Sequence, residues 1–162
     1  MQKSFSLLLA ITILLSACNK STTTEKCTYV APTAVAPAAE IASLKAWLDA
    51  NSLEYTQHSS GLFYKIVTPG TGTVPDVCSN VGVKYIGRLT TSSTSFDENT
   101  TGTAFVLGQL ITGWQIGIPL IHSGGSIILY IPPSLGYGTA GAGSAIPPNS
   151  YLVFSIELLG IR

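Results

Sequence analysis

The feature that most constrains the fold of this chain is a series of short apolar runs, each closed by glycine or proline, from residue 61 onward. In residues 61–68, Leu62, Tyr64 and Ile66 alternate with other residues up to the cluster at 69–72. Residues 81–90 alternate in the same way. A period of two places side chains on opposite faces of a strand, and Pro–Gly clusters end strands in turns. The pattern favours an all-β or α+β domain with many turns.

Three further strands and one helix are expected in the second half of the chain. Residues 104–107, 126–131 and 151–159 are the apolar runs that we interpret as strands. Trp114, Ile118 and Ile121 recur at roughly helical spacing, so residues 111–121 are expected to form the one short helix of the domain. The loop at 137–148 is rich in Gly, Ala and Pro and is too apolar for a simple spacer.

An amphipathic helix is expected before the strands, over residues 38–51. Its apolar stripe consists of Ile41, Leu44, Trp47 and Leu48. We interpret this helix as one that packs onto the domain or a neighbour and carries no chemistry. Residues 38–60 then form the helix and its connection, and residues 61–162 the main domain.

The first residues have the pattern of a bacterial lipoprotein signal. Lys3 precedes an apolar run that is too short to span a bilayer, and Leu15-Ser16-Ala17-Cys18 is similar to a lipobox. This resemblance implies cleavage of a signal peptide at 1–17 and lipidation of Cys18. The Ser, Thr, Ala and Pro content of the residues that follow predicts a flexible tether over 18–37. A plain secretory signal is the alternative. Either signal takes the domain out of the cytoplasm, and the lipidated form is anchored to a membrane of the cell envelope.

Two cysteines remain after such processing, Cys27 and Cys78. In an oxidising compartment they are most simply a disulfide, and two free thiols are the alternative. Neither has ligand partners at the spacing of a zinc site, so no metal is expected.

Charge excludes some functions. The chain has 8 Lys and Arg against 8 Asp and Glu, so it lacks the basic excess that nucleic acid binding requires. Both histidines, His58 and His122, lie beside turn-like polar segments, where we expect surface residues and not general bases. No cofactor is expected.

Aromatic and branched residues around a lone acid occur in a specific order. The motifs are Val83-Lys84-Tyr85-Ile86-Gly87, Ser95-Phe96-Asp97, Phe105-Val106-Leu107-Gly108, Leu110-Ile111-Thr112-Gly113-Trp114, Gly136-Tyr137-Gly138, Ile146-Pro147-Pro148-Asn149 and Leu152-Val153-Phe154-Ser155-Ile156. In this order and spacing, over about 100 residues, the chain resembles the FKBP-type peptidyl-prolyl cis–trans isomerases. The resemblance implies an α+β fold, with a twisted antiparallel sheet of about five strands wrapped around one short helix. The helix at 38–51 is additional to that fold.

The resemblance also implies a site. Trp114 would form the floor of a pocket for a substrate proline ring, and the Ile111 N–H and the Tyr137 hydroxyl would each bind a carbonyl. The remaining catalytic residues would be Tyr85, Phe96, Asp97 and Phe154, and the remaining substrate-binding residues Leu110, Phe105, Ala145 and Ile146. Asp97 has two open roles, as a turn or network acid or as a group that orients the carbonyl or the pocket tyrosines.

Three departures from the family pattern are Thr103, where a large aromatic is usual, Ala145 in the flap, and a shorter segment between Gly108 and Leu110. They imply a pocket that is more open on one side.

From the resemblance as a whole, the first expectation is a monomeric isomerase that acts on proline-containing polypeptides in the cell envelope. A proline-segment binding module with little turnover is the second, and a structural lipoprotein that docks through the helix is the third.

Overall fold

The computed structural model describes residues 27–162. Its helices are α1 (Ala38–Ala50) and α2 (Thr112–Gly117), with 3₁₀ turns η1 (Leu107–Gln109), η2 (Ile118–Leu120) and η3 (Pro133–Leu135). Its strands are β1 (Thr56–Gln57), β2 (Phe63–Thr68), β3 (Asn80–Leu89), β4 (Ser95–Val106), β5 (Ser126–Ile131) and β6 (Leu152–Ile161). Within this part of the chain the strands form one antiparallel sheet in the order β1-β2-β5-β6-β3-β4. The predicted fold class and the N-terminal helix are confirmed.

The sheet has six strands among the described residues, one more than the expected five. The additional strand, β1, is a pair of exposed polar residues that bonds to the edge of β2 through its backbone. Strand β4 also begins at Ser95, whereas the expected strand began at residue 104. Neither segment has an apolar alternation, because edge strands are held by the ladder and face solvent. Hydrophobic periodicity therefore does not detect them.

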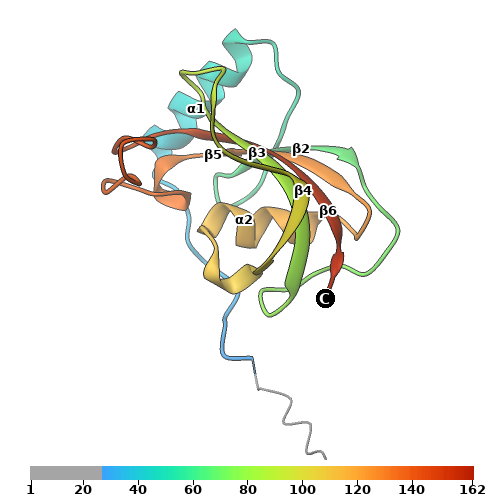
Figure 1. Ribbon diagram of the computed structural model, residues 1–162. Coiled ribbons are helices and arrows are strands. Elements are labelled where there is room, and N and C mark those ends of the chain that lie inside the picture. Colours follow the sequence, from blue (N-terminus) through green and yellow to red (C-terminus); the bar gives the residue numbers. More distant parts are fainter. Residues whose placement is uncertain (1–26) are drawn as a thin grey trace, which may run out of the picture.

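The two helices cover opposite faces of the sheet (Figure 1). Along β5, Ile127, Leu129 and Ile131 belong to the main core with α2, whereas Tyr130 packs with α1. The side-chain period of two in a strand produces this division. A strand that is buried on both faces reads as a continuous apolar run, as residues 126–131 do.

Two glycines allow α2 to lie very close to β5. A Cβ atom at Gly113 would lie 2.7 Å from the Ile131 Cγ2 atom, and one at Gly117 would lie 2.5 Å from the Leu129 Cδ2 atom. Real Cβ atoms do not approach other atoms so closely, so any larger residue at either position would displace the buried side chains of Ile131 or Leu129. The close approach places Trp114, between them in the helix, against the concave side of the sheet.

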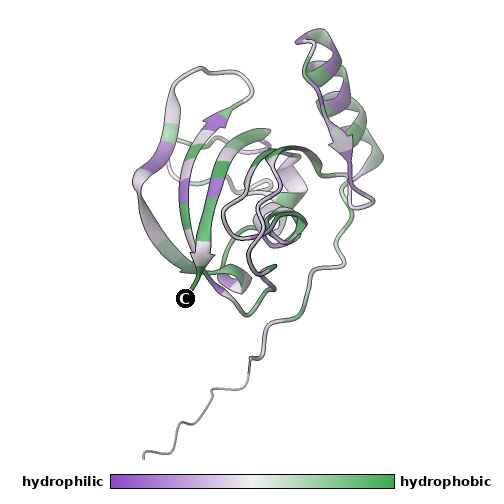
Figure 2. Ribbon diagram, turned by 90° about the vertical axis from the view of Figure 1, so that its right-hand side faces the viewer, coloured by the Kyte–Doolittle hydropathy of each residue, from purple (hydrophilic) through white to green (hydrophobic). Residues whose placement is uncertain are grey.

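Helix α1 packs on the outer face of the sheet. Leu44 and Leu48 are buried there against Phe63 and Tyr130, and the exposed side of the helix carries the polar bands that Figure 2 shows. Burying a leucine side chain contributes roughly 1.5–3 kcal/mol, so this pair holds α1 on the domain. The expectation that the helix packs onto the domain agrees with these contacts.

The segment before α1 also contacts the domain. Cys27 is disulfide-bonded to Cys78, with Cα atoms 5.7 Å apart, and the Tyr29 hydroxyl accepts a hydrogen bond from Gln109 Nε2 at 2.7 Å. The Ala36 side chain is buried in the main core. The predicted signal peptide at 1–17 and the lipidation of Cys18 lie outside the described residues.

No helix among residues 27–162 is both long enough and apolar enough to cross a membrane.

Candidate functional site

A cavity of about 220 Å³ opens on the face of the sheet that α2 covers. Strands β3, β4 and β6, helix α2 and two loops each contribute side chains to it. Its lining residues are Tyr85, Asp97, Phe105, Leu110, Ile111, Trp114, Tyr137 and Phe154. All eight are among the site residues that the sequence predicted. They come from positions up to 69 residues apart, between Tyr85 and Phe154, and the fold brings them together.

Four aromatic rings make the walls and floor of the cavity. The Trp114 ring lies edge-to-face with Phe154, with ring centroids 5.2 Å apart, and with Tyr85 at 5.3 Å. Phe105 lies 6.4 Å from Trp114 in the same edge-to-face manner. Such pairs stabilise each other by about 0.5–1.5 kcal/mol beyond their burial, so the rings form a rigid set. Trp114 is buried, and its indole N–H has no partner within residues 27–162.

The lone acid of the cavity is held by a tyrosine. The Tyr85 hydroxyl donates a hydrogen bond to Asp97 Oδ2 at 2.7 Å. Burial raises the pKa of Tyr85 to about 12, and the hydrogen bond to Asp97 adds to the effect. Burial, together with the charge of Asp97, also raises the pKa of Tyr137. Both phenols therefore keep their protons at neutral pH and can act as donors.

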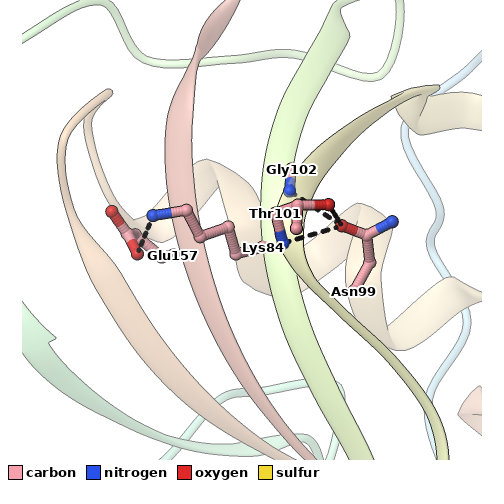
Figure 3. Close-up of polar contacts among 5 residues, drawn as sticks. All are labelled: Lys84, Asn99, Thr101, Gly102 and Glu157. Carbon is pink, nitrogen blue, oxygen red and sulfur yellow. Dashed lines mark hydrogen bonds and ion pairs between the residues drawn. The ribbon is translucent and has the colours of Figure 1, made fainter.

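A bulge in β4 separates the two cavity residues of that strand. Asn99 pairs with Tyr85 and Thr103 with Val83, so residues 100–102 face a single residue of β3. Asn99 Oδ1 closes the bulge by accepting hydrogen bonds from Gly102 N at 2.7 Å and Thr101 N at 3.2 Å (Figure 3). Bulges of this kind bend a strand and redirect its side chains. Here Asp97 lies before the bulge and Phe105 after it, and both reach the cavity.

A side chain of α2, the helix that follows, holds the rim of the cavity at Leu110 and Ile111 through hydrogen bonds. Gln115 Nε2 donates to the Leu110 carbonyl at 2.7 Å and to the Gly108 carbonyl at 3.3 Å. Ile111 has φ −59° and ψ 149° and precedes the first turn of α2. Its own N–H has no hydrogen-bond partner within residues 27–162. A backbone donor is thus free beside the cavity.

Tyr137 enters the cavity from the loop that follows η3. The Gly136 N–H and the Gly138 N–H both donate to the Pro133 carbonyl, each at 2.9 Å, and fix the backbone on both sides of Tyr137. The Tyr137 ring is half-buried in the main core. Its hydroxyl forms no hydrogen bond with residues 27–162, so the cavity has a second free donor.

Three predicted site residues do not line the cavity. Phe96 packs edge-to-face on Phe154, with centroids 5.5 Å apart, and supports that wall from behind. Ile146 is buried in the main core and bridges to Ala142, and Ala145 is exposed. Motif order places these residues near the site, but the register shift of β4 at Phe96 and the fold of the loop decide which of them reach the cavity.

The structure adds residues that the sequence did not identify as part of the site. Gln115 braces the rim, and Asn99 closes the bulge. Gly87 leaves room for two rings, because a Cβ atom there would lie 2.6 Å from Phe154 Cε1 and 2.8 Å from Phe96 Cζ. The roles of Asn99 and Gly87 depend on strand register and leave no signal in the sequence.

A larger hollow, of about 380 Å³, lies on the outer face of the sheet. It is lined by outward residues such as Ile86, Ile128 and Ser155. Lys84 and Glu157 also line it and form an exposed ion pair of 3.4 Å between the neighbouring strands β3 and β6 (Figure 3). An exposed pair of this kind contributes little to stability. The predicted site residues converge on the smaller cavity, so size does not identify the site here.

The small cavity can bind and orient a ligand without forming a covalent bond. Its walls are aromatic and branched, Asp97 is the one lining residue with an ionisable acid, and two donors face it. This composition fits a small apolar ring with an adjacent carbonyl. Fold and cavity together define the class, an α+β domain with an aromatic cavity between its sheet and a short helix.

Comparisons with known proteins identify the family. A model of the FKBP-type peptidyl-prolyl cis-trans isomerases matches residues 72–159. A probable FKBP-type peptidyl-prolyl cis-trans isomerase of Haemophilus influenzae is 43% identical over 106 residues, which are 64% of this chain and 44% of that relative. This chain belongs to the FKBP-type peptidyl-prolyl cis-trans isomerase family.

Two crystal structures show the same fold. A peptidyl-prolyl cis-trans isomerase from Pseudomonas syringae has a TM-score of 0.67 at 32% identity, over 78% of this chain and 97% of that one. FkpA from Escherichia coli has a TM-score of 0.68 at 38% identity, over 77% of this chain and 60% of that one. The chain spans only 25–44% of the length of several curated relatives that it matches.

Proposed function

We propose that this protein catalyses rotation about X–Pro peptide bonds of exported polypeptides in the cell envelope. The observation that carries the proposal is the aromatic cavity above Trp114, with the Ile111 N–H and the Tyr137 hydroxyl free beside it. The family membership gives the reaction class. The proline ring would lie on Trp114, and the two donors would each bind a carbonyl of the peptide.

This chemistry needs no nucleophile. Rotation about the peptide bond crosses a resonance barrier of about 18–20 kcal/mol and takes tens of seconds for X–Pro bonds without a catalyst. A turnover of about 1–10³ s⁻¹ requires a decrease in the barrier of roughly 3–7 kcal/mol. The twisted amide has less charge separation than the planar one, so aromatic walls favour it. Binding of the proline ring and its neighbours then stabilises the transition state more than the ground state.

Asp97 has a role in this proposal through Tyr85. The carboxylate accepts the Tyr85 hydrogen bond and so fixes one wall of the cavity. Of the two roles that the sequence left open, this contact favours orientation of a pocket tyrosine.

The experiment follows isomerisation of a short X–Pro peptide with residues 25–162 and with variants of the two site elements. Trp114→Ala removes the floor, and Trp47→Ala in α1, where the ring packs on Tyr130 away from the cavity, is the matched tryptophan control. Ile111→Pro removes the free N–H together with the side chain and leaves the backbone path unchanged, because φ −59° at this residue suits proline and the extended Leu110 before it tolerates one. Ile111→Ala keeps that N–H and controls for the lost side chain.

We expect a rate gain with the parent, a loss with Trp114→Ala, and a larger loss with Ile111→Pro than with Ile111→Ala. A folded parent without any rate gain would refute the enzyme. Peptide binding in that same sample would then assign the domain as a binding module for proline-containing segments.

The envelope location rests on the lipobox-like residues 15–18. We propose that Cys18 is lipidated and holds the domain at a membrane surface. Incorporation of a labelled fatty acid into the full chain, and its loss in Cys18→Ser, is the expected result. Labelling that persists in Cys18→Ser would refute the anchor.

A further inference from the structure

Helix α1 contacts a loop of the catalytic domain as well as the outer face of the sheet. Glu40, in the first turn of α1, accepts two hydrogen bonds from Ser134 through one carboxylate oxygen, Oε2. The Ser134 N–H lies at 2.9 Å from it and the Ser134 hydroxyl at 2.8 Å. The two residues are 94 positions apart, and Glu40 precedes the part of the chain that the family model matches.

Ser134 belongs to the turn that carries Tyr137 into the cavity. Because Pro133 has no N–H, the Ser134 N–H is the first backbone donor of η3. A carboxylate that accepts from such a donor makes a charge-assisted hydrogen bond. The Pro133 carbonyl, one residue earlier, accepts from Gly136 and Gly138 on the two sides of Tyr137. The carboxylate of Glu40 thus acts on the same short turn that sets the position of Tyr137.

Glu40 is itself held in place by the domain. The Ala36 N–H donates to the Ser60 carbonyl at 2.8 Å, and the Ala36 side chain is buried. On the other side of Glu40, the Ile41 side chain packs over Gly61. The first turn of α1 is therefore fixed on both sides, and a rigid acceptor limits the movement of the turn that it binds.

We propose that Glu40 is a positioning residue for Tyr137, so that the helix before the family domain is part of the support of the active site. Glu40 is not among the residues that line the cavity and acts only through Ser134 and η3. This inference rests on the proposed function for its kinetic readout. It extends the function to a residue of α1, a helix for which the sequence predicts no chemistry.

The experiment uses the full chain and compares Glu40→Ala with Asp49→Ala. Asp49 is the matched control, because it lies on the same helix and also accepts two side-chain hydrogen bonds, from Lys45 at 2.7 Å and Tyr55 at 2.6 Å. Each substitution is made in the parent and in Tyr137→Phe. Hydrogen exchange of the Gly138 amide, measured by NMR, gives a second readout that does not depend on activity.

We expect Glu40→Ala to lower kcat/KM by about three- to ten-fold in the parent. In the Tyr137→Phe background, the same substitution should leave kcat/KM unchanged, because the hydroxyl that Glu40 positions is already absent. Exchange of the Gly138 amide should rise in Glu40→Ala and stay unchanged in Asp49→Ala. If Glu40 had a purely structural role, Glu40→Ala would lower kcat/KM by the same factor in the parent and in Tyr137→Phe. Alternatively, Glu40→Ala and Asp49→Ala would lower it to the same extent.

The outcomes separate this inference from the proposed function. An inactive parent refutes the function, and the exchange measurement then decides the role of Glu40 alone. An active parent with unchanged Gly138 exchange in Glu40→Ala, or with equal kinetic losses in the two backgrounds, refutes the positioning role and leaves the function intact.

Discussion

At the scale of single residues, the Tyr85–Asp97 pair shows how the cavity keeps a charged group without losing its apolar walls. Asp97 itself is exposed at the edge, and Tyr85 carries the hydrogen bond inward from it. The ring of Tyr85 meanwhile packs edge-to-face on Trp114. One side chain thus has an apolar face toward the cavity and a polar end toward the acid, which is a common use of a partly buried tyrosine.

The raised pKa of Tyr85 predicts a specific loss of stability at alkaline pH. Its value is about 12 in the folded domain against 10.0 for an unperturbed tyrosine. The unfolded chain therefore loses this proton at lower pH than the folded chain does. The contribution of Tyr85 to the free energy of unfolding is fully present below pH 10 and falls as the pH rises toward about 12.

The test is urea unfolding of the parent and Tyr85→Phe between pH 9 and about 11.5, a range set by the two pKa values. We expect the free energy of unfolding to fall more steeply with pH in the parent. Tyr130, whose pKa is also raised, is present in both proteins and cancels in the comparison. Parallel curves would contradict the assignment.

At the scale of elements, the cavity depends on how closely a helix of six residues can approach the sheet. Such a short helix is marginal on its own and is held by its contacts with β5. Gly113 and Gly117 make those contacts possible, at the cost of a lower helix propensity.

Gly117→Ala is therefore expected to destabilise the domain, although alanine favours helices by about 1 kcal/mol over glycine. Its Cβ would lie 2.5 Å from the buried Leu129 side chain, and overpacking of this kind costs about 1–3 kcal/mol. Gly160→Ala is the control, because no atom lies within 4 Å of a Cβ placed there. Thermal unfolding that shows Gly117→Ala to be as stable as Gly160→Ala would refute the packing argument.

The sequence was informative wherever a signal is local. Leu44 and Leu48 mark the buried side of α1, and the continuous run at 126–131 marks a strand that is buried on both faces. The order of the aromatic motifs predicted all eight lining residues of the cavity, because those motifs match a family whose fold brings them together.

The features that the sequence did not reveal depend on long-range geometry. Glu40 and Ser134 form hydrogen bonds although they are 94 positions apart in the sequence, and neither residue type predicts the contact. Phe96 and Ala145 lie within motifs of the site, yet neither lines the cavity, because Phe96 is the extra residue at a register shift of β4 and packs on Phe154, and Ala145 is exposed in its loop. The backbone ladder of β1 has no side-chain signature at all.

At the scale of the whole molecule, the disulfide joins the segment before α1 to the loop before β3. Cys78 lies next to Val77 and Ser79, whose carbonyls accept from Gly108 N at 2.7 Å and Leu107 N at 2.9 Å. The bond to Cys27 therefore fixes the N-terminal segment beside the turn η1 that precedes the rim of the cavity.

Reduction of this disulfide is expected to lower the free energy of unfolding by roughly 2–4 kcal/mol, because a loop of 51 residues is released in the unfolded chain. Urea unfolding with and without a reductant measures the effect. In Cys27→Ser/Cys78→Ser the reductant should change nothing, which separates loss of the bond from other effects of the reagent. An identical midpoint for the reduced and oxidised parent would contradict the prediction.

The central place of β6 determines when this domain can become a single sheet. Strand β6 lies between β5 and β3, so before it is added β1-β2-β5 and β3-β4 are two separate sheets with open edges. The chain leaves the ribosome, and crosses a membrane if exported, from its N-terminus. The two partial sheets therefore cannot pair into one sheet until β6, Leu152–Ile161, has been synthesised or exported. Until that moment Phe154 is missing from the cavity, and the domain has no complete site with which to act on its own prolines or on those of another chain.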